Sequence, residues 1–225
     1  MKPLPNIAID GPAGAGKSTT ARLLAKKLGY LYVDTGAMYR AVTLKALMNK
    51  IDPVNESLIT SIAEDAKITF RTDANGDTRL FLNGLDVTEA IRTPLVSKNV
   101  SLVSRFPGVR RKLSDLQREM ASQGGVVMEG RDIGTYVLPD AKVKFFLTAS
   151  IEERARRRHQ ELKQKGYDIE LTEVIEDIKH RDEIDSNRSW APLKPAPDAK
   201  IINCSDLSAD QVIEIMQASV SGGRQ

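Results

Sequence analysis

The chain has 225 residues, and 33 lysines and arginines against 30 aspartates and glutamates leave it a net charge of +3. This charge is too small to indicate a protein that wraps nucleic acid, and the single cysteine, Cys204, excludes an internal disulfide bond and fits a reducing compartment. Two histidines leave no zinc cluster, and no apolar run reaches membrane-spanning length. We therefore expect a cytoplasmic protein whose partners are neither nucleic acids nor membranes.

The first predicted strand, turn and helix carry a phosphate-binding motif. The apolar run of residues 7–9 ends at Asp10, residues 11–18 read GPAGAGKS, and a helix-forming stretch follows. This order places G-x-x-x-x-G-K-[ST] between a strand and a helix, where backbone N–H groups and the helix N-terminus cradle phosphates. Lys17 would then reach the β- and γ-phosphates, and Ser18 would bind Mg²⁺. The alternative is a glycine-rich turn that only joins strand to helix, but both flanks favour a loop that binds a nucleoside triphosphate.

A second strand and helix follow the first pair. Residues 31–33 are apolar, and the DTGAMYR segment after them offers Asp34 or Thr35 as a helix N-cap. A strand, a helix and a second strand make a parallel α/β unit. Tyr39 and Arg40 lie near the glycine-marked start of the second helix. Either they face a ligand, or Tyr39 is a core residue and Arg40 is solvated.

The pattern changes between residues 66 and 87. Residues 67–71 alternate in polarity, the Asn75-Gly76 pair signals a hairpin turn, and residues 79–82 form the answering strand. A further Asn-Gly pair, at residues 83–84, turns the chain into a third short strand. These features predict a small antiparallel sheet that forms a lobe of its own.

Beyond the lobe, the chain returns to alternating helices and strands. A helix is expected from about residue 97 to 122, with a break or kink at Pro107. Buried-type strands are predicted at residues 124–128, 142–147 and 200–203. With the first two strands they make a five-stranded, doubly wound α/β sheet, in which ligands bind beyond the carboxyl ends of the strands. This places residues 34–40 and 129–132 at the same edge as the phosphate loop.

Two predicted helices are rich in arginine. Residues 151–158 twice place an arginine four residues after a glutamate, which is also the pattern of a plain solvent-exposed helix. In the helix of residues 173–188, Arg181, Asp185 and Arg188 share one stripe. Two arginines beside a carboxylate suit an anionic ligand with hydroxyl groups, such as a nucleotide, while ion pairing within the helix is the alternative.

The assembled motifs resemble the bacterial cytidylate kinase family, within the P-loop nucleoside monophosphate kinases. The matching segments are IDGPAGAGKST, DTGAMYR, EAIRT, FPGVR, EGRDIGT, FLTAS with its arginine helix, and RDEIDSNRSWAPLKPAPDA, which run from Ile9 to Ala199. The resemblance implies a three-layer P-loop NTPase fold, with helices on both faces of a five-stranded parallel sheet, a small antiparallel insert and a helical lid. It also implies a core at residues 1–60 and 104–225, a lid at about 151–170, and an inserted monophosphate-binding lobe at 61–103.

The resemblance also implies roles for individual residues. The phosphates of ATP and Mg²⁺ would be held by Gly11, Pro12, Ala13, Gly14, Ala15, Gly16, Lys17, Ser18 and Thr19, with Ser18 on the metal. The substrate CMP would be bound through its cytosine by Thr35, Ser101, Arg110 and Asp132, through its phosphate by Arg40, Arg131 and Arg181 with Arg188 nearby, through its sugar by Asp185, and also by Tyr39. Arg154, Arg157 and Arg158 would lie on the lid and act in catalysis with Lys17 and Arg131. Glu129 would hold metal or water.

The activity that the resemblance implies is transfer of the γ-phosphoryl group of ATP to CMP, and also to dCMP, in pyrimidine nucleotide metabolism. The enzyme would use Mg²⁺ and act as a monomer. One alternative is a P-loop kinase for another small acceptor, such as a different monophosphate or shikimate. Another is a nucleotide-gated switch, in which the acceptor-side arginines would have no purpose.

Overall fold

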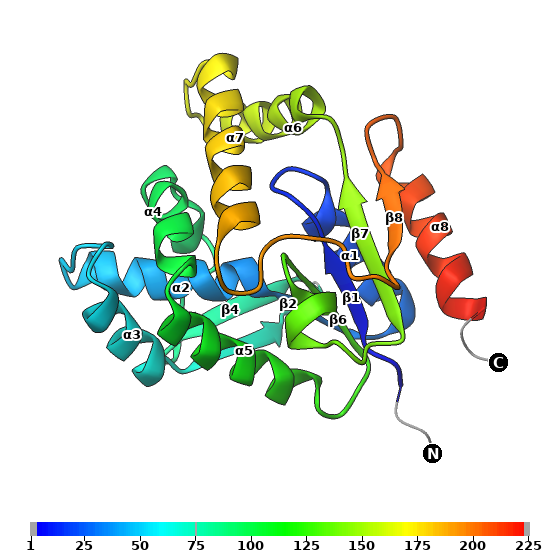
Figure 1. Ribbon diagram of the computed structural model, residues 1–225, viewed down its shortest axis with the longest axis horizontal. Helices are drawn as coiled ribbons and strands as arrows, with labels where there is room; N and C mark the ends of the chain where they lie inside the picture. The colour runs from blue at the N-terminus through cyan, green and yellow to red at the C-terminus, as the bar shows by residue number, and fades with distance from the viewer. Residues whose placement is uncertain (1–3, 75, 223–225) are drawn as a thin grey trace. The chain divides into compact units, whose positions relative to one another are not determined.

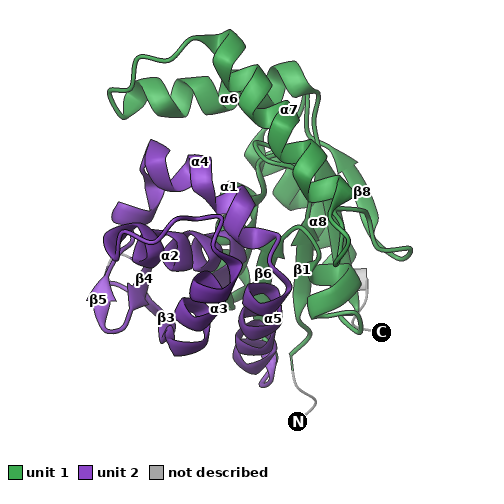
Figure 2. Cartoon of the chain, turned by 60° about the vertical axis from the view of Figure 1, so that its left-hand side comes forward, with its two compact units in different colours: residues 1–31, 124–225 green, residues 32–123 purple. Residues whose placement is uncertain are grey.

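The computed structural model describes residues 4–74 and 76–222 (Figure 1). The chain divides into two compact units, shown in different colours in Figure 2. Unit 1 comprises residues 1–31 and 124–225, and unit 2 comprises residues 32–123. The predicted lobe of residues 61–103 lies inside unit 2, which extends beyond it at both ends because the helices before and after the small sheet pack against one another.

Unit 1 alternates helices and strands, whereas unit 2 has helices on either side of three consecutive strands. The elements of unit 1 are β1 (Ile7–Asp10), α1 (Lys17–Leu28), β6 (Val126–Gly130), the π-helical turn η2 (Ile133–Val137), β7 (Val143–Thr148), α6 (Ile151–Gln164), α7 (Leu171–Asn187), β8 (Lys200–Asn203) and α8 (Ala209–Gly222). Strand β2 (Leu31–Asp34) begins at the boundary. Unit 2 continues with α2 (Thr35–Met48), α3 (Glu56–Asp65), β3 (Ile68–Thr72), β4 (Thr78–Leu82), β5 (Leu85–Asp86), the 3₁₀ turn η1 (Ala90–Arg92), α4 (Pro94–Ser104) and α5 (Pro107–Ala121).

The central sheet has five strands in the order β2-β6-β1-β7-β8, which confirms the predicted set (Figure 1). Strand β1 pairs in parallel with β6 and with β7, and β7 pairs in parallel with β8. Every residue of β1 and of β6 is buried, as expected for parallel strands covered on both faces. Because β1 and β6 are parallel, with Asp10 opposite Gly130, their carboxyl ends lie at the same edge of the sheet.

Helices α1 and α8 pack together, α1 on β1 and β6 and α8 on β7. The apolar positions of α1 repeat with helical spacing, and Ala21, Leu24 and Ala25 are buried. Gly29 ends the helix in the left-handed conformation, at φ 67°, and its N–H donates to the carbonyl oxygen of Lys26. This packing fixes the first turn of α1, which follows the phosphate loop.

The second sheet, β3-β4-β5, is antiparallel and lies wholly within unit 2, as the sequence predicts. Its second hairpin turns at Asn83 and Gly84, both with positive φ, which is the geometry that favours an Asn-Gly pair. In the first hairpin, Asn75 lies outside the described residues. The helix expected at residues 97–122 is two helices, because the chain leaves the helical path between α4 and α5, where Pro107 begins α5.

Helices α6 and α7 pack against each other through a small apolar cluster. Its buried members are Ala155, Leu162, Val174 and Ile178. The cluster joins the arginine-rich helix α6 to the helix that carries Arg181 and Asp185, so the two arginine-bearing helices pack as one body. Within residues 4–74 and 76–222, no helix is both long enough and apolar enough to cross a membrane.

Candidate active site

The loop between β1 and α1 has the shape of a phosphate cradle. Gly11 and Gly14 have positive φ values of 147° and 77°. A side chain at Gly11 would overlap the carbonyl oxygen of Leu147, and one at Gly14 would lie 2.9 Å from the Cβ atom of Arg154. No side chain caps the first turn of α1, and no acidic residue lies in it. The N–H groups of this turn therefore face a region suited to an anion.

Lys17 is buried at the start of α1, and its Nζ donates to the carbonyl oxygen of Pro12 at 2.7 Å. Burial, and next the nearby charge of Arg131, lower its pKa to about 7, although Glu129, Asp10 and Asp185 act in the opposite direction. A triphosphate beside Nζ would favour the charged form. Whether the Lys17 amine is protonated at neutral pH therefore depends on whether an anionic ligand is bound.

Asp10 ends β1 immediately before this loop. Its two carboxylate oxygens accept hydrogen bonds from the N–H groups of Ile133 and Gly134, each at 2.8 Å. Burial raises the pKa of Asp10 to about 6, against the lowering effect of these two bonds. This role of Asp10 is not predictable from the sequence, because its partners lie more than 120 positions away in the chain.

At the end of β6, the structure brings together several predicted residues within unit 1. Arg131 Nε donates to Asp185 Oδ2 at 2.8 Å, and Arg188 lies 3.4 Å from Asp132 and 3.6 Å from Asp185. Although burial opposes ionisation, Arg131, then Arg188 and Arg181, hold the pKa of the Asp185 carboxyl below its usual value. Arg131, which follows β6, and Arg188, which follows α7, thus both pair with the buried carboxylate of Asp185. The ion pairs are therefore not confined to helix α7.

The three predicted lid arginines are held in different ways. Arg154 is buried and donates to the carbonyl oxygens of Ala149, at 3.0 Å, and of Ala13 in the phosphate loop, at 3.1 Å. It also donates to Asp182 of α7 at 2.6 Å. Arg157 and Arg158 are only partly buried. Arg154 therefore touches the phosphate loop directly.

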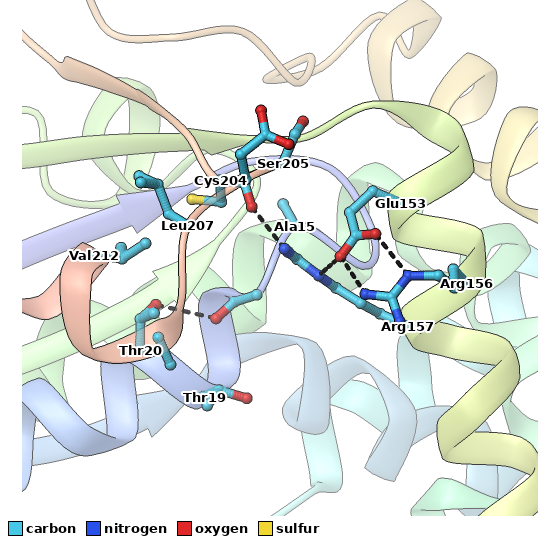
Figure 3. Close-up of a pocket in the computed structure, with 13 residues that line it drawn as sticks. Ala15, Thr19, Thr20, Glu153, Arg156, Arg157, Cys204, Ser205, Leu207 and Val212 are labelled. Atoms are coloured by element: carbon cyan, nitrogen blue, oxygen red, sulfur yellow. Dashed lines mark hydrogen bonds and ion pairs between the residues drawn. The ribbon is translucent and has the colours of Figure 1, made fainter.

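A cavity of about 490 Å³ lies beside the phosphate loop (Figure 3). Its lining comes from the loop and α1, from α6, and from the segment between β8 and α8: Ala15, Gly16, Thr19, Thr20, Glu153, Arg156, Arg157, Cys204, Ser205, Asp206, Leu207, Ala209 and Val212. Arg157 crosses one side of it, donating to Glu153 at 2.7 Å and to the carbonyl oxygen of Cys204 at 2.6 Å. Hydrogen bonds from Arg156, then from Arg157, lower the pKa of Glu153 to about 2. Neither Glu153 nor the segment after β8 carries a sequence motif that marks it as part of a site.

Unit 2 holds the other predicted substrate residues. Asp34 caps α2, since its Oδ1 accepts from the N–H of Ala37 at 2.8 Å, and its Oδ2 accepts from Arg40 at 3.1 Å. Tyr39 is buried, and the guanidinium of Arg110 lies 5.6 Å from the centre of its ring. Thr35 and Ser101 are also buried in this unit. Arg40 is thus ion-paired rather than simply solvated.

Several of the arginines that are predicted to bind phosphate form an ion pair with a carboxylate of their own unit. The pairs are Arg40–Asp34, Arg131–Asp185, Arg154–Asp182, Arg157–Glu153, Arg158–Glu161 and Arg188–Asp132, with separations from 2.6 to 3.4 Å. Buried charges need such partners. A phosphate that binds to one of these arginines would therefore have to replace the carboxylate with which the arginine is already paired.

The family model for cytidylate kinase matches residues 7–221 of this chain. The chain belongs to the cytidylate kinase family. The cytidylate kinase of Pelotomaculum thermopropionicum is 57% identical over 225 residues, covering 100% of both chains. That of Desulforamulus reducens is 53% identical over 218 residues, covering 97% of each. These relatives confirm the family that the motifs resemble.

Solved structures similar to this cytidylate kinase family member support the fold. A shikimate kinase from Bacteroides thetaiotaomicron aligns with a TM-score of 0.50 at 15% identity, covering 96% of this chain and 98% of its own. An uncharacterized protein from Eubacterium ventriosum aligns with a TM-score of 0.52 at 12% identity, covering 96% and 98%. At these identities the likeness concerns the fold alone, which is the predicted P-loop kinase fold.

One further segment has a pattern used by guanine-type switches. Residues 49–52 read Asn-Lys-Ile-Asp. In this family member they follow helix α2 rather than a strand of the central sheet. Asn49 is the C-cap of α2, and Lys50 has a positive φ of 55°. Asp52 accepts a hydrogen bond from the N–H of Val54 at 3.1 Å. The segment is a helix-terminating turn, and it does not favour a nucleotide-gated switch.

Proposed function

We propose that this cytidylate kinase family member transfers the γ-phosphoryl group of ATP to CMP and to dCMP, forming ADP with CDP or dCDP. The observation that carries the proposal is the joint presence, in unit 1, of the phosphate loop with Lys17 and of the Arg131–Asp185–Arg188 group. The first suits a triphosphate donor, and the second suits a phosphorylated sugar. The reaction belongs to pyrimidine nucleotide metabolism.

The donor is proposed to bind across residues 11–19, with its phosphates at the first turn of α1. The adjoining cavity of about 490 Å³ then takes the base and ribose of ATP. Lys17 contacts the β- and γ-phosphates, and Arg154, Arg157 and Arg158 contribute positive charge from α6. Support comes from the contact between Arg154 and the carbonyl oxygen of Ala13, which already joins α6 to the loop.

Mg²⁺ is the proposed cofactor. Among the described residues, no cluster of three or more His, Cys, Asp or Glu side chains is arranged to hold a metal ion. This fits an ion that keeps several waters and takes one or two protein ligands together with substrate phosphates. The exposed hydroxyl of Ser18, next to Lys17, is the protein ligand we assign. When bound, the ion neutralises charge on the β- and γ-phosphate oxygens.

The acceptor is proposed to be bound by the residues that the family motifs imply. Its phosphate is held by Arg40, Arg131, Arg181 and Arg188; its cytosine by Thr35, Ser101, Arg110 and Asp132, beside Tyr39; and its sugar hydroxyls by Asp185. Asp132 selects cytosine because a carboxylate accepts a hydrogen bond from the N4 amino group, whereas uracil presents an oxygen there. Each arginine can bind phosphate without leaving its buried charge unpaired, because it is paired with a carboxylate before the phosphate binds.

The proposed chemistry needs no protein base. A phosphate monoester has its second pKa near about 6, so at neutral pH the acceptor is mostly a dianion and already a nucleophile. The remaining tasks are to align two anions and to stabilise charge on the transferring group. Lys17 and the arginines do this, and closure of α6 and α7 would exclude water that hydrolyses ATP. Glu129, buried at the end of β6, favours the charged form of Lys17.

A cytoplasmic monomer completes the proposal, and the single, buried thiol of Cys204 fits a reducing compartment. The test is a coupled assay of ADP release with CMP, dCMP, UMP, AMP, GMP and shikimate as acceptors. We expect CMP and dCMP to have the highest kcat/KM, and Lys17→Ala to lower turnover by about a hundredfold or more in a natively folded variant. Turnover of another acceptor with none of CMP would refute the proposed substrate.

A further inference from the structure

Asp10 makes an unusual contact for the last residue of a buried strand. Its side chain reaches the π-helical turn η2 and accepts the N–H groups of that turn's first two residues, Ile133 and Gly134. Asp132 occupies the cap position of this turn, but its own side chain makes no capping bond. Asp10 therefore supplies from β1 the cap that a helical turn normally takes from the residue before it.

The turn that Asp10 caps is continuous with Asp132. The carbonyl oxygen of Asp132 accepts from the N–H groups of Tyr136, at 2.8 Å, and Val137, at 3.1 Å. The backbone of Asp132 is therefore fixed on one side by strand β6 and on the other by a turn whose first N–H groups are bound by Asp10. The Asp132 carboxylate does not cap the turn, and it forms an ion pair with Arg188.

We propose that Asp10 is a positioning residue for base selection, because it sets where the carboxylate of Asp132 stands. The inference rests on the proposed function, in which Asp132 meets the N4 amino group of cytosine. In this scheme Asp10 itself makes no contact with CMP. Its position at the end of the same strand that leads into the phosphate loop joins base selection to the donor side of the site.

The chemistry of the contact explains why a carboxylate is needed. Two neighbouring N–H groups point at two acceptor oxygens, and an amide offers only one acceptor, so Asp10→Asn sets an NH₂ group against an N–H group. The space around the turn is tight: a Cβ at Gly134 would lie 3.1 Å from Lys144 and 3.4 Å from Asp10. Repulsion between the NH₂ group and the N–H group would displace the turn, and a displacement of about 1 Å can cost up to a hundredfold in rate.

The test compares Asp10→Asn with Asp132→Asn and with Ile7→Val, a fully buried control on the same strand. For each folded variant, kcat/KM is measured for CMP and for UMP at pH 8, together with the melting temperature. We expect Asp10→Asn to narrow the CMP:UMP ratio by at least about tenfold, as Asp132→Asn does, while Ile7→Val lowers the melting temperature and keeps the wild-type ratio. An effect of Asp10 on Lys17 would lower both constants alike and leave the ratio unchanged.

The outcomes separate this inference from the proposed function. A wild-type ratio in Asp10→Asn, with a narrowed ratio in Asp132→Asn, overturns the positioning role and leaves the proposed function standing. A wild-type ratio in Asp132→Asn overturns base selection by that residue. If Asp10→Asn does not fold, Gly134→Ala tests the same turn, because its methyl group would lie 3.1 Å from Lys144 and would displace the turn that Asp10 caps. Its ratio should narrow by about threefold or more, and a wild-type ratio would count against the inference.

Discussion

Lys17 should take up a proton when Mg·ATP binds. Burial, and next the charge of Arg131, lower its pKa to about 7 in the nucleotide-free protein. A triphosphate beside Nζ favours the ammonium form, and would return the pKa toward its ordinary value of about 10.4. At pH 8 a group with a pKa of about 7 is about one-tenth protonated, so binding should take up about 0.9 proton. At pH 6 the group is already about nine-tenths protonated, and the uptake should fall to about 0.1 proton.

Isothermal titration calorimetry measures this uptake directly. The magnesium complex of a non-hydrolysable ATP analogue is titrated into the protein in buffers of equal pH but different ionisation enthalpy, and the slope of observed enthalpy against ionisation enthalpy gives the proton count. Lys17→Met is the control, since it keeps the length of the side chain and removes the titrating group. A slope that is equal at pH 6 and pH 8, or that persists in Lys17→Met, would refute the assignment of a lowered pKa to Lys17.

Three further predictions concern α6 and unit 2. Glu153→Gln should raise the KM for ATP by about threefold or more and leave the KM for CMP unchanged, because it releases Arg157 from the cavity wall, whereas the exposed Glu152→Gln should change neither. Hydrogen exchange over residues 151–165 should slow when CMP and the ATP analogue are both bound, and unchanged exchange would contradict a closing lid. Replacing residues 67–86 by a short linker should raise the KM for CMP far more than that for ATP, and equal rises in a folded variant would assign the small sheet a bracing role.

The elements of the fold could be predicted where local pattern determines them. The five central strands are short apolar runs bounded by glycine or polar residues, and Asn83-Gly84 takes the positive φ values that such a pair favours. The break between α4 and α5 follows from Pro107, which begins a helix more readily than it continues one. Such signals lie within a few residues of the structure they produce.

The rest depends on contacts between distant parts of the chain. The cap from Asp10 to Gly134 spans 124 positions, and the bond from Arg157 to the carbonyl oxygen of Cys204 spans 47. Neither has a periodicity or a motif that sequence alone would display. The boundaries of unit 2 likewise depend on how α2, α3, α4 and α5 pack together, which composition along the chain does not reveal.

The points at which the chain leaves and re-enters unit 1 lie next to each other. The N–H of Leu31 donates to the carbonyl oxygen of Gly125 at 2.9 Å, so residues 32–123 form an excursion whose two ends meet. The entropy of closing such an excursion grows only with the logarithm of its length, at about 0.6 kcal/mol for each doubling. Insertions and deletions beyond β2, within residues 35–123, should therefore cost the closing frame little free energy. Such changes would alter the part of the proposed acceptor site that unit 2 supplies, such as Ser101 and Arg110, while Asp132 and the phosphate loop stay in the frame of unit 1.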